Sequence, residues 1–419
     1  MITLSLIILI VALVLIGQPL FVIVGSISAF CFHFIADEEI KNIISDIFYA
    51  GDKEILLAIP LFVLAGNLMT QGSISKRLIR LASALTAPIP SGMAIASVLS
   101  CAIFAAISGS SPVTLIAVGT ILYPALIDKG YSKKLSVGML SAGGTLGIII
   151  PPSIPMIIFA IMAGVSVTKL FMAGIGPGIL LSSLLIGYAI IAGPGFSQRG
   201  KWDFQEVIKA TKSGILSLLM PVVILGGIYS GFFTATESAG IAVVYAFFVE
   251  AFIHRELKLR MLPKIFSDTS EMLGTIFIIL VLAVSLNKFM TYEQIPQMLV
   301  DSMSSFVTGK ISFLIGVNIM LLLVGCMMDI MSAILILAPI LTPMAKVFGI
   351  DPVHFGILMI VNLEIGYLTP PVGINLFVAS GIFNENLGNV IKAILPLIGV
   401  LLIGLLLITF IPEISLFLL

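Results

Sequence analysis

Charged residues are scarce in this chain. Asp, Glu, Lys and Arg make up 10% of its 419 residues, whereas an ordinary soluble domain has about 25%. Hydrophobic residues make up 59%, which leaves too little polar surface to cover a body of this size in water. The 21 Lys and Arg residues balance the 21 Asp and Glu residues, so there is no basic excess for nucleic acid. The composition excludes a soluble enzyme and predicts an all-α polytopic membrane protein in a lipid bilayer.

Residues that carry out chemistry are also few. The three cysteines each lie alone in an apolar stretch, so they predict neither a disulfide framework nor a metal site. The sequence has no glycine-rich phosphate-binding loop with its Lys, no His/Cys cluster and no Ser/His/Asp arrangement. These absences argue against an enzyme and against ATP hydrolysis by this chain. Energy for transport would have to come from an ion gradient or from another subunit.

Apolar runs recur along the whole chain. They predict membrane spans near 3–16, 20–35, 54–72, 135–163, 170–194, 214–233, 237–254, 273–287, 353–379 and 389–411. Two further apolar stretches, 91–127 and 312–347, are each split in the middle by Gly, Ser, Pro or Asp. Each arm has about 15–18 residues, or roughly 22–27 Å as a helix, against a hydrocarbon core of about 30 Å. Re-entrant helical hairpins therefore fit these stretches better than pairs of ordinary short helices joined by a loop.

The distribution of charge predicts an orientation. Lys and Arg are in excess around the first hairpin but not around the second. Because cytoplasmic loops are enriched in Lys and Arg, we expect the first hairpin to enter from the cytoplasm, the second from the opposite side, and both termini to be periplasmic. The polar segments 41–53, 75–90 and 291–306 predict amphipathic helices at the interface, either as braces or as plain connectors.

The sequence also contains an internal repeat. Two consecutive prolines occur only at Pro151-Pro152 and Pro370-Pro371, 219 residues apart, and the hairpins and spans align with the same shift. We therefore divide the chain into two repeats, 1–194 and 195–419, with broken helices at 135–163 and 353–379. Each repeat has five crossings, so the second should be inserted upside down. Inverted repeats with interrupted helices are typical of secondary transporters.

The proline pairs suggest ion sites. Two prolines in succession unwind a helix and release carbonyl oxygens, which need a partner in lipid, and a hard cation such as Na⁺ is a suitable one. The alternative is a pair of structural kinks. The candidate sodium ligands at the breaks and hairpin tips are Ser108, Ser110, Gly147, Ile150, Ser153, Gly325, Asp329, Gly366, Thr369 and Val372.

The half-helices that begin at the breaks suit an anionic substrate, because helix N-termini carry free N–H groups and a positive dipole end. Candidate substrate contacts are Ser111 at the first tip and Ser153 and Asn375 just past the breaks; the last two could instead only cap helices. Glu364 precedes the second break and could hold the unwound backbone, whereas Glu237 predicts a helix start. The three histidines lie near predicted span ends, where we expect interfacial side chains: His33, His254 and His354.

Several stretches resemble one known family, the large membrane subunit of tripartite ATP-independent periplasmic (TRAP) transporters. They are Ala106–Thr114 (AISGSSPVT), Gly143–Phe159 (GGTLGIIIPPSIPMIIF), Phe171–Gly178 (FMAGIGPG), Gly231–Ala239 (GFFTATESA) and Gly366–Asn375 (GYLTPPVGIN). The resemblance implies an elevator-type carrier of the wider ion-transporter superfamily in the bacterial inner membrane. It implies Na⁺-coupled uptake of an organic anion, a separate periplasmic binding protein and a small four-helix membrane subunit. It also implies two Na⁺ sites, one at Ser110, Gly147 and Ile150 and one at Gly325, Gly366 and Thr369.

Our preferred hypothesis is the large permease subunit of such an importer, with a C4-dicarboxylate, sialic acid or a related sugar or oxo acid as substrate. The runner-up is a stand-alone Na⁺/dicarboxylate or citrate symporter that needs no binding protein. A channel is a hypothesis from another class, and a membrane enzyme is the weakest. The sequence does not name the acid, the Na⁺ stoichiometry or the oligomeric state.

Overall fold

The computed structural model describes all residues except 1, 37–38, 40, 194–201 and 304–308. Every regular element in the described part is a helix, so the predicted all-helical fold is confirmed. Eight helices there are long and apolar enough to cross a membrane, or nine if one bent pair counts as a single span. By length alone two hairpin arms are among the eight, so the re-entrance of the hairpins stays a prediction.

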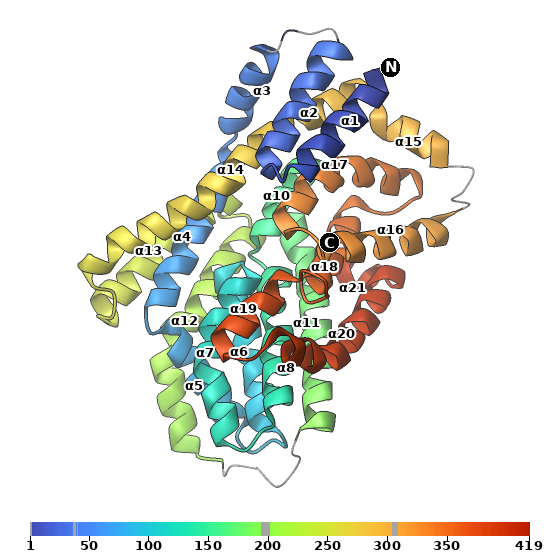
Figure 1. Cartoon of the computed structure of the whole chain (residues 1–419). Helices are drawn as coiled ribbons and strands as arrows, with labels where there is room; N and C mark the ends of the chain where they lie inside the picture. The colour runs from blue at the N-terminus through green and yellow to red at the C-terminus, as the bar shows by residue number, and fades with distance from the viewer. Residues whose placement is uncertain (1, 37–38, 40, 194–201, 304–308) are drawn as a thin grey trace.

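The first part of the chain follows the predicted order of spans, hairpin and broken helix (Figure 1). Its early helices are α1 (Ile2–Leu15), α2 (Leu20–Phe34), α3 (Lys41–Gly51), α4 (Ala58–Gln71, after a 3₁₀ turn at Glu54–Leu57) and α5 (Ile74–Thr86). The hairpin is α6 (Gly92–Ser108) and α7 (Ser111–Asp128). The broken helix is α8 (Lys133–Gly144), α9 (Leu146–Ile149) and α10 (Ile154–Ala163), with a bend of 41°. The long α11 (Val167–Ala192) follows.

The second part repeats this order. It begins with α12 (Phe204–Tyr229), α13 (Ala235–Phe248, extended by a π-helical turn at Val249–Ile253), α14 (Leu262–Tyr292, after a 3₁₀ turn at Leu259–Met261) and α15 (Ile295–Met303). The hairpin is α16 (Lys310–Gly325) and α17 (Ile330–Val347), and the broken helix is α18 (Pro352–Gly366) and α19 (Ile374–Phe383). The chain ends with α20 (Leu387–Phe410) and α21 (Glu413–Leu416). The upside-down insertion of the two repeats stays a prediction.

Two predicted boundaries are wrong. We expected spans at 214–233 and 273–287, but α12 begins at Phe204 and α14 begins at Leu262. The charged residues near these starts lie inside the helices. Hydropathy marks where contact with lipid begins, whereas a helix begins where its main-chain hydrogen bonding begins. The polar segments are helices α3, α5 and α15 as predicted; positions 304–306 of the third lie outside the described residues.

The centre of the molecule is built around α18. Every residue from Val353 to Gly366 in this helix is buried, and it packs against α10, α11, α16, α17 and α20. The early helices α1 to α3 pack with α14 at the top of Figure 1, and α5 and α12 lie at the lower left. The first half of the second broken helix therefore lies in the interior, whereas its second half, α19, is partly exposed, with Phe377 at 52%.

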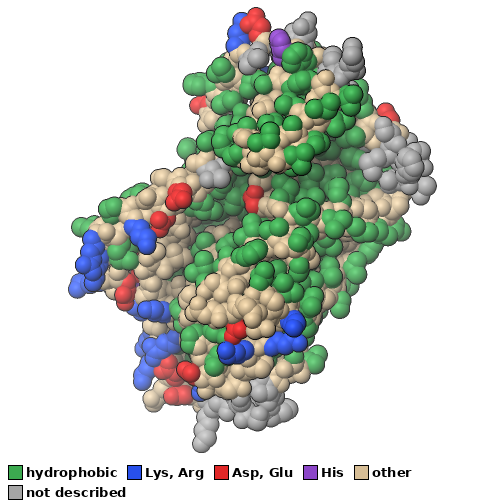
Figure 2. All heavy atoms as spheres, viewed as in Figure 1, with side chains coloured by type: hydrophobic (Ala, Val, Ile, Leu, Met, Phe, Trp, Pro, Cys, Tyr) green, Lys and Arg blue, Asp and Glu red, His purple; other side chains and the backbone are tan. Residues whose placement is uncertain are grey.

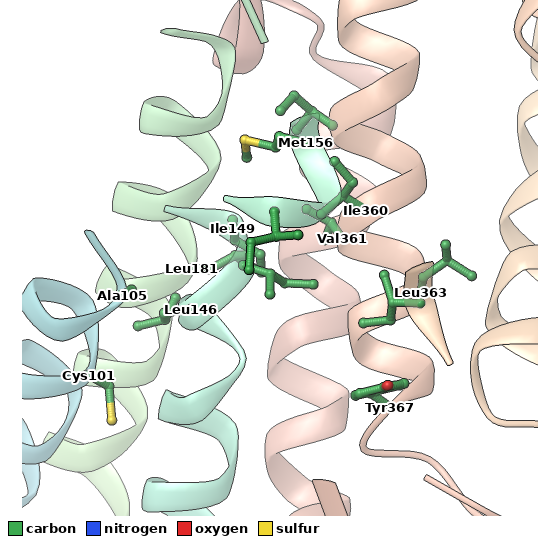
Figure 3. Close-up of a cluster of buried hydrophobic side chains, with 14 of the residues drawn as sticks. Cys101, Ala105, Leu146, Ile149, Met156, Leu181, Ile360, Val361, Leu363 and Tyr367 are labelled. Atoms are coloured by element: carbon green, nitrogen blue, oxygen red, sulfur yellow. The ribbon is translucent and has the colours of Figure 1, made fainter. Parts of the chain in front are cut away.

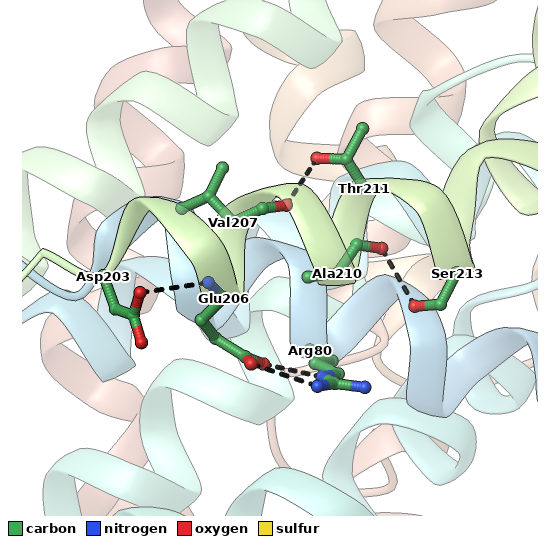
Figure 4. Close-up of polar contacts among 7 residues, drawn as sticks. All are labelled: Arg80, Asp203, Glu206, Val207, Ala210, Thr211 and Ser213. Carbon is green, nitrogen blue, oxygen red and sulfur yellow. Dashed lines mark hydrogen bonds and ion pairs between the residues drawn. The ribbon is translucent and has the colours of Figure 1, made fainter.

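Basic side chains gather at one end. Figure 2 shows Lys and Arg over the left part of the molecule, where α13 ends and α14 begins, and over the lower part around α5, α12 and the start of α8, while the middle of this face is mainly apolar. At this end Arg80 of α5 forms a two-pronged ion pair with Glu206 of α12, with Nε–Oε1 at 2.7 Å and Nη2–Oε2 at 3.1 Å (Figure 4). The hydrogen bonds and charge of Glu206 raise the pKa of Arg80. Asp203 caps the same helix by accepting from the amide of Glu206 at 3.2 Å, so α5 and α12 are joined where α12 begins.

Candidate transport site

The first hairpin tip lies against the first helix break. The Ile154 amide at the start of α10 donates to the Gly109 carbonyl at the tip, at 3.4 Å. A Cβ added at Gly147 would lie 2.5 Å from the Ser110 carbonyl oxygen, so the two main chains touch and only glycine fits. Ser153 is adjacent as well, because its Cα would lie 3.6 Å from a Cβ at Gly109. Of the residues predicted for the first ion site, the structure brings together Ser110, Gly147 and Ser153, while the Ile150 side chain packs toward Gly178 of α11.

Hydroxyl groups surround this tip. The Ser108 and Thr114 hydroxyls lie 2.6 Å apart, and both reach the Ser110 carbonyl oxygen, at 3.2 and 2.9 Å. All three residues are buried. Sequence analysis missed Thr114, although its position four residues after Ser110, one helical turn away, was the available signal. The Ser153 hydroxyl is buried and is one of the oxygens in the described part of the chain with no hydrogen-bond partner.

The second tip meets the second break in the same way. A Cβ at Gly366 would lie 2.6 Å from Cα and the carbonyl carbon of Gly325. The amides of Val372 and Gly373 donate to the Cys326 carbonyl at 3.1 and 3.2 Å. Glycines that are repeat mates, Gly147 and Gly366, thus each allow a hairpin tip to approach a broken helix. Thr369 is at this break too, but its hydroxyl donates to the Ile365 carbonyl of its own helix, at 2.8 Å.

Asp329 has a structural role at the second tip. Its Oδ1 accepts a hydrogen bond from the Ser332 amide at 3.1 Å, so the side chain caps the start of α17. An acid near a helix N-terminus is also favoured by the helix dipole. This contact accounts for an acid at the tip without an ion, and a role for Asp329 as a sodium ligand stays a prediction.

A buried carboxyl group connects the two repeats. Glu364 Oε1 accepts from the Ser111 hydroxyl at 2.5 Å and from the Asn375 side-chain amide at 3.1 Å, and that amide also donates to Ser111 Oγ at 2.5 Å. None of the three residues is exposed. The structure thus brings together two of the predicted substrate contacts, Ser111 and Asn375, but around an acid. Because the side chains of Ser111 and Asn375 are already hydrogen-bonded to Glu364, this cluster links α7, α18 and α19, and direct contact of either residue with an organic acid stays a prediction.

The first break is enclosed by apolar side chains. Figure 3 shows a cluster of buried hydrophobic side chains that includes Leu146, Ile149 and Met156 of the first broken helix and Ile360, Val361 and Leu363 of α18. All six are buried. Electrostatic interactions are stronger in such a setting than in water, and an unpaired carbonyl is more costly. The first unwound segment is therefore a place where a bound cation would be held strongly, whereas Val372 in the second is 40% exposed.

Sequence analysis missed other buried polar contacts. The side chains of Asn318, Asn362 and Thr409 join α16, α18 and α20, with the Asn362 amide 2.6 Å from Asn318 Oδ1.

The prediction of interfacial histidines is wrong for two of the three. His354 is 1% exposed and bonds to Ser415, and the His254 side chain is 5% exposed and pairs with Glu250. His354 lies near a helix end that is covered by α21, whereas the partner of His254 belongs to its own helical segment. Glu237 forms the predicted capping box with Thr234.

The amino-acid sequence matches a known family. Residues 6–414 match the model described as "Tripartite ATP-independent periplasmic transporter, DctM component". The chain belongs to the DctM family of TRAP transporters. Members of this family are membrane-spanning transporter subunits, so the prediction that this chain is not an enzyme is confirmed.

Individual relatives agree with this assignment. The C4-dicarboxylate TRAP transporter large permease protein DctM of Vibrio cholerae is 39% identical, over 97% of this chain and 95% of its own length. The isethionate TRAP transporter permease protein DctMQ of Oleidesulfovibrio alaskensis is 38% identical, over 86% of this chain and 58% of its own length. The YdaH transporter of Alcanivorax borkumensis has a similar fold, with a TM-score of 0.60 and 16% identity over 88% of this DctM-family chain and 86% of that chain.

Proposed function

We propose that this chain is the large permease subunit of a Na⁺-coupled importer of organic acid anions. The observation that carries the proposal is the paired geometry of the two hairpin tips. In each repeat a tip contacts an unwound double-proline segment through a glycine, Gly147 or Gly366. The ligand atoms available there are the oxygens of main-chain carbonyls and hydroxyls. Such oxygens suit a hard monovalent cation that must be released again.

Co-transported Na⁺ would bind at both contacts. At the first, the Ser110 carbonyl and the hydroxyls of Ser108 and Thr114 are within hydrogen-bond distance of one another, so one ion can reach several of them. Binding there would fix the tip against the broken helix. An ordered tip would also favour substrate binding, and by reciprocity bound substrate would favour Na⁺ binding.

We place the substrate beside the start of α10. The buried, unpartnered Ser153 hydroxyl lies at that helix start, where free amides and the dipole favour a carboxylate. Ser111 and Asn375 are occupied by Glu364, so we expect them to shape the site indirectly. The printed substrates of two relatives, C4-dicarboxylate and isethionate, support the class of organic anion.

The partners would be a small four-helix membrane subunit and a periplasmic binding protein that delivers the anion. The location would be the bacterial inner membrane, with both termini periplasmic. During transport the hairpins and broken helices (α6–α10 and α16–α19) would travel together as an elevator. They would move against a scaffold formed by α1–α5 and α12–α15.

Reconstitution tests this function. We expect proteoliposomes that contain both membrane subunits, supplied with the binding protein, to take up its anion saturably and against a gradient only with an inward Na⁺ gradient. The double variant Ser110→Ala/Thr369→Ala should show a weaker dependence on Na⁺. Ser183→Ala is a matched control, because it removes an exposed hydroxyl bonded only to its own helix.

The alternatives give different results. Uptake that is unchanged when choline replaces Na⁺ would refute the coupling. Concentrative uptake without the binding protein would identify a stand-alone symporter, and a flux that does not saturate would identify a channel.

A further inference from the structure

A small basic pocket lies at the same end as the other Lys and Arg residues. It is formed where α8 and α20 begin, and these helices pack against each other. The cavity has a volume of about 270 Å³ and is lined by Lys133, Lys134, Val137, Glu385, Asn389, Lys392 and Ala393. It is remote from the hairpin tips in sequence and in role, and nothing in the proposed transport cycle uses it.

The charges in this pocket do not balance. Glu385 Oε1 binds the Lys133 ammonium at 3.0 Å, and Oε2 accepts from the Asn389 side-chain amide at 3.2 Å. Both carboxylate oxygens are therefore engaged. Among the described residues neither Lys134 nor Lys392 forms an ion pair. Two ammonium groups are left facing a cavity that also receives the positive dipole ends of two helices.

The surface beside the pocket is apolar. On α20, Leu395 lies one turn after Lys392 and is 55% exposed, and Ile403 and Leu406 continue the same face at 55% and 52%. This helix is apolar enough to span a membrane. A ridge of this kind contacts lipid chains. The pocket therefore offers cations beside a surface that lipid covers, which fits an amphipathic anion better than a soluble one.

We propose that this pocket binds the headgroup phosphate of an anionic phospholipid. Lys134 and Lys392 would contact the phosphate oxygens, and the acyl chains would lie along the exposed face of α20. Basic pockets between membrane helices are common binding places for such headgroups. The lipid would join α8 to α20 at the start of both helices.

Native mass spectrometry of the purified protein with phosphatidylglycerol tests this proposal. We expect Lys134→Gln/Lys392→Gln to weaken phosphatidylglycerol binding about tenfold, since each surface Lys contributes substantially to anionic lipid binding. Glu385→Gln should tighten it, because the change releases Lys133. The matched control is Lys209→Gln/Lys212→Gln, which removes two exposed charges from α12 and should leave binding unchanged.

Three results would overturn the proposal. One is equal weakening in the control, which would mean general surface attraction. Another is unchanged binding in the pocket variant. The third is competition by glycerol 1-phosphate or inorganic phosphate as strong as that by the lipid, which would indicate a soluble phosphate ester as the ligand. Thermal unfolding in lipid-free detergent checks that each variant is folded.

Discussion

At the scale of single residues, two glycines control how closely the hairpin tips approach the broken helices. We expect Gly147→Ala and Gly366→Ala each to lower the initial uptake rate about tenfold and to raise the Na⁺ concentration for half-maximal rate. The added methyl group would lie 2.5 or 2.6 Å from main-chain atoms of the tip, and overpacking of this kind costs roughly 1–3 kcal/mol. Uptake into proteoliposomes at varied Na⁺ measures both quantities.

Two other glycines provide the control. A Cβ at Gly187 in α11 or Gly316 in α16 meets no atom within 4 Å, and alanine favours a helix over glycine. We expect Gly187→Ala and Gly316→Ala to transport normally. If Gly147→Ala kept the wild-type Na⁺ dependence, the first contact would not be an ion site.

The sequence predicted the main-chain positions of the candidate site but not all of its side chains. Double prolines at a common shift placed Gly147 near the first break and Gly366 near the second, because prolines and glycines fix backbone geometry wherever they occur. No proline or glycine landmark of this kind marks Thr114 or Asn362. Their partners depend on how each helix is rotated in the packed core, which a span prediction does not specify.

At the scale of elements, the order of helices was predictable and their ends were less so. Apolar runs identified the spans, and the breaks and tips at Gly109, Pro151 and Pro370 were recognised from their composition. The helix starts at Phe204 and Leu262 were not. There the hydrogen-bonded helix continues beyond the apolar run, so hydropathy alone places the boundary too late.

An ion pair between elements predicts a pH effect. Hydrogen bonding to Lys133 is the main reason that the pKa of Glu385, in the loop before α20, is lower than usual. A carboxyl with a depressed native pKa stabilises the fold above its unfolded value of about 4.3, and this contribution is lost as the pH falls through the lower native value. We expect wild type to melt at a higher temperature than Glu385→Gln at pH 7.

The difference in melting temperature should shrink as the pH falls below the unfolded value of about 4.3 and disappear below the native pKa, as followed by far-ultraviolet circular dichroism. Glu256→Gln, at an exposed acid that forms no ion pair among the described residues, should show no such pH-dependent difference. A constant gap between wild type and Glu385→Gln at all pH values would contradict this account.

At the scale of the whole molecule, the elevator proposal requires α6 to slide past α4. These helices touch at Gly66, where an added Cβ would lie 3.6 Å from Ser108 Cα. With a Cα–Cβ bond of about 1.5 Å, this distance puts the two Cα atoms at most about 5.1 Å apart, and a disulfide usually joins Cα atoms about 4.4–6.8 Å apart. We expect Gly66→Cys/Ser108→Cys, in a background without the native cysteines, to lose uptake when oxidised and to recover it on reduction.

The reduced double variant and Ser108→Cys alone give the baseline, since Ser108 belongs to the candidate ion site. Gly66→Cys alone, treated with the same oxidant, is a further control, because it has no second cysteine on α6 to bond with. Full uptake by the oxidised α4–α6 variant would argue against the sliding motion.

The complete burial of α18 has a consequence for how this protein can diverge. A helix with a covered side chain at every position from Val353 to Gly366 offers no place for a neutral change, since each replacement must be matched by a neighbour. Relatives that transport different substrates should therefore keep the sequence of α18 nearly constant. Their differences should accumulate in the peripheral helices.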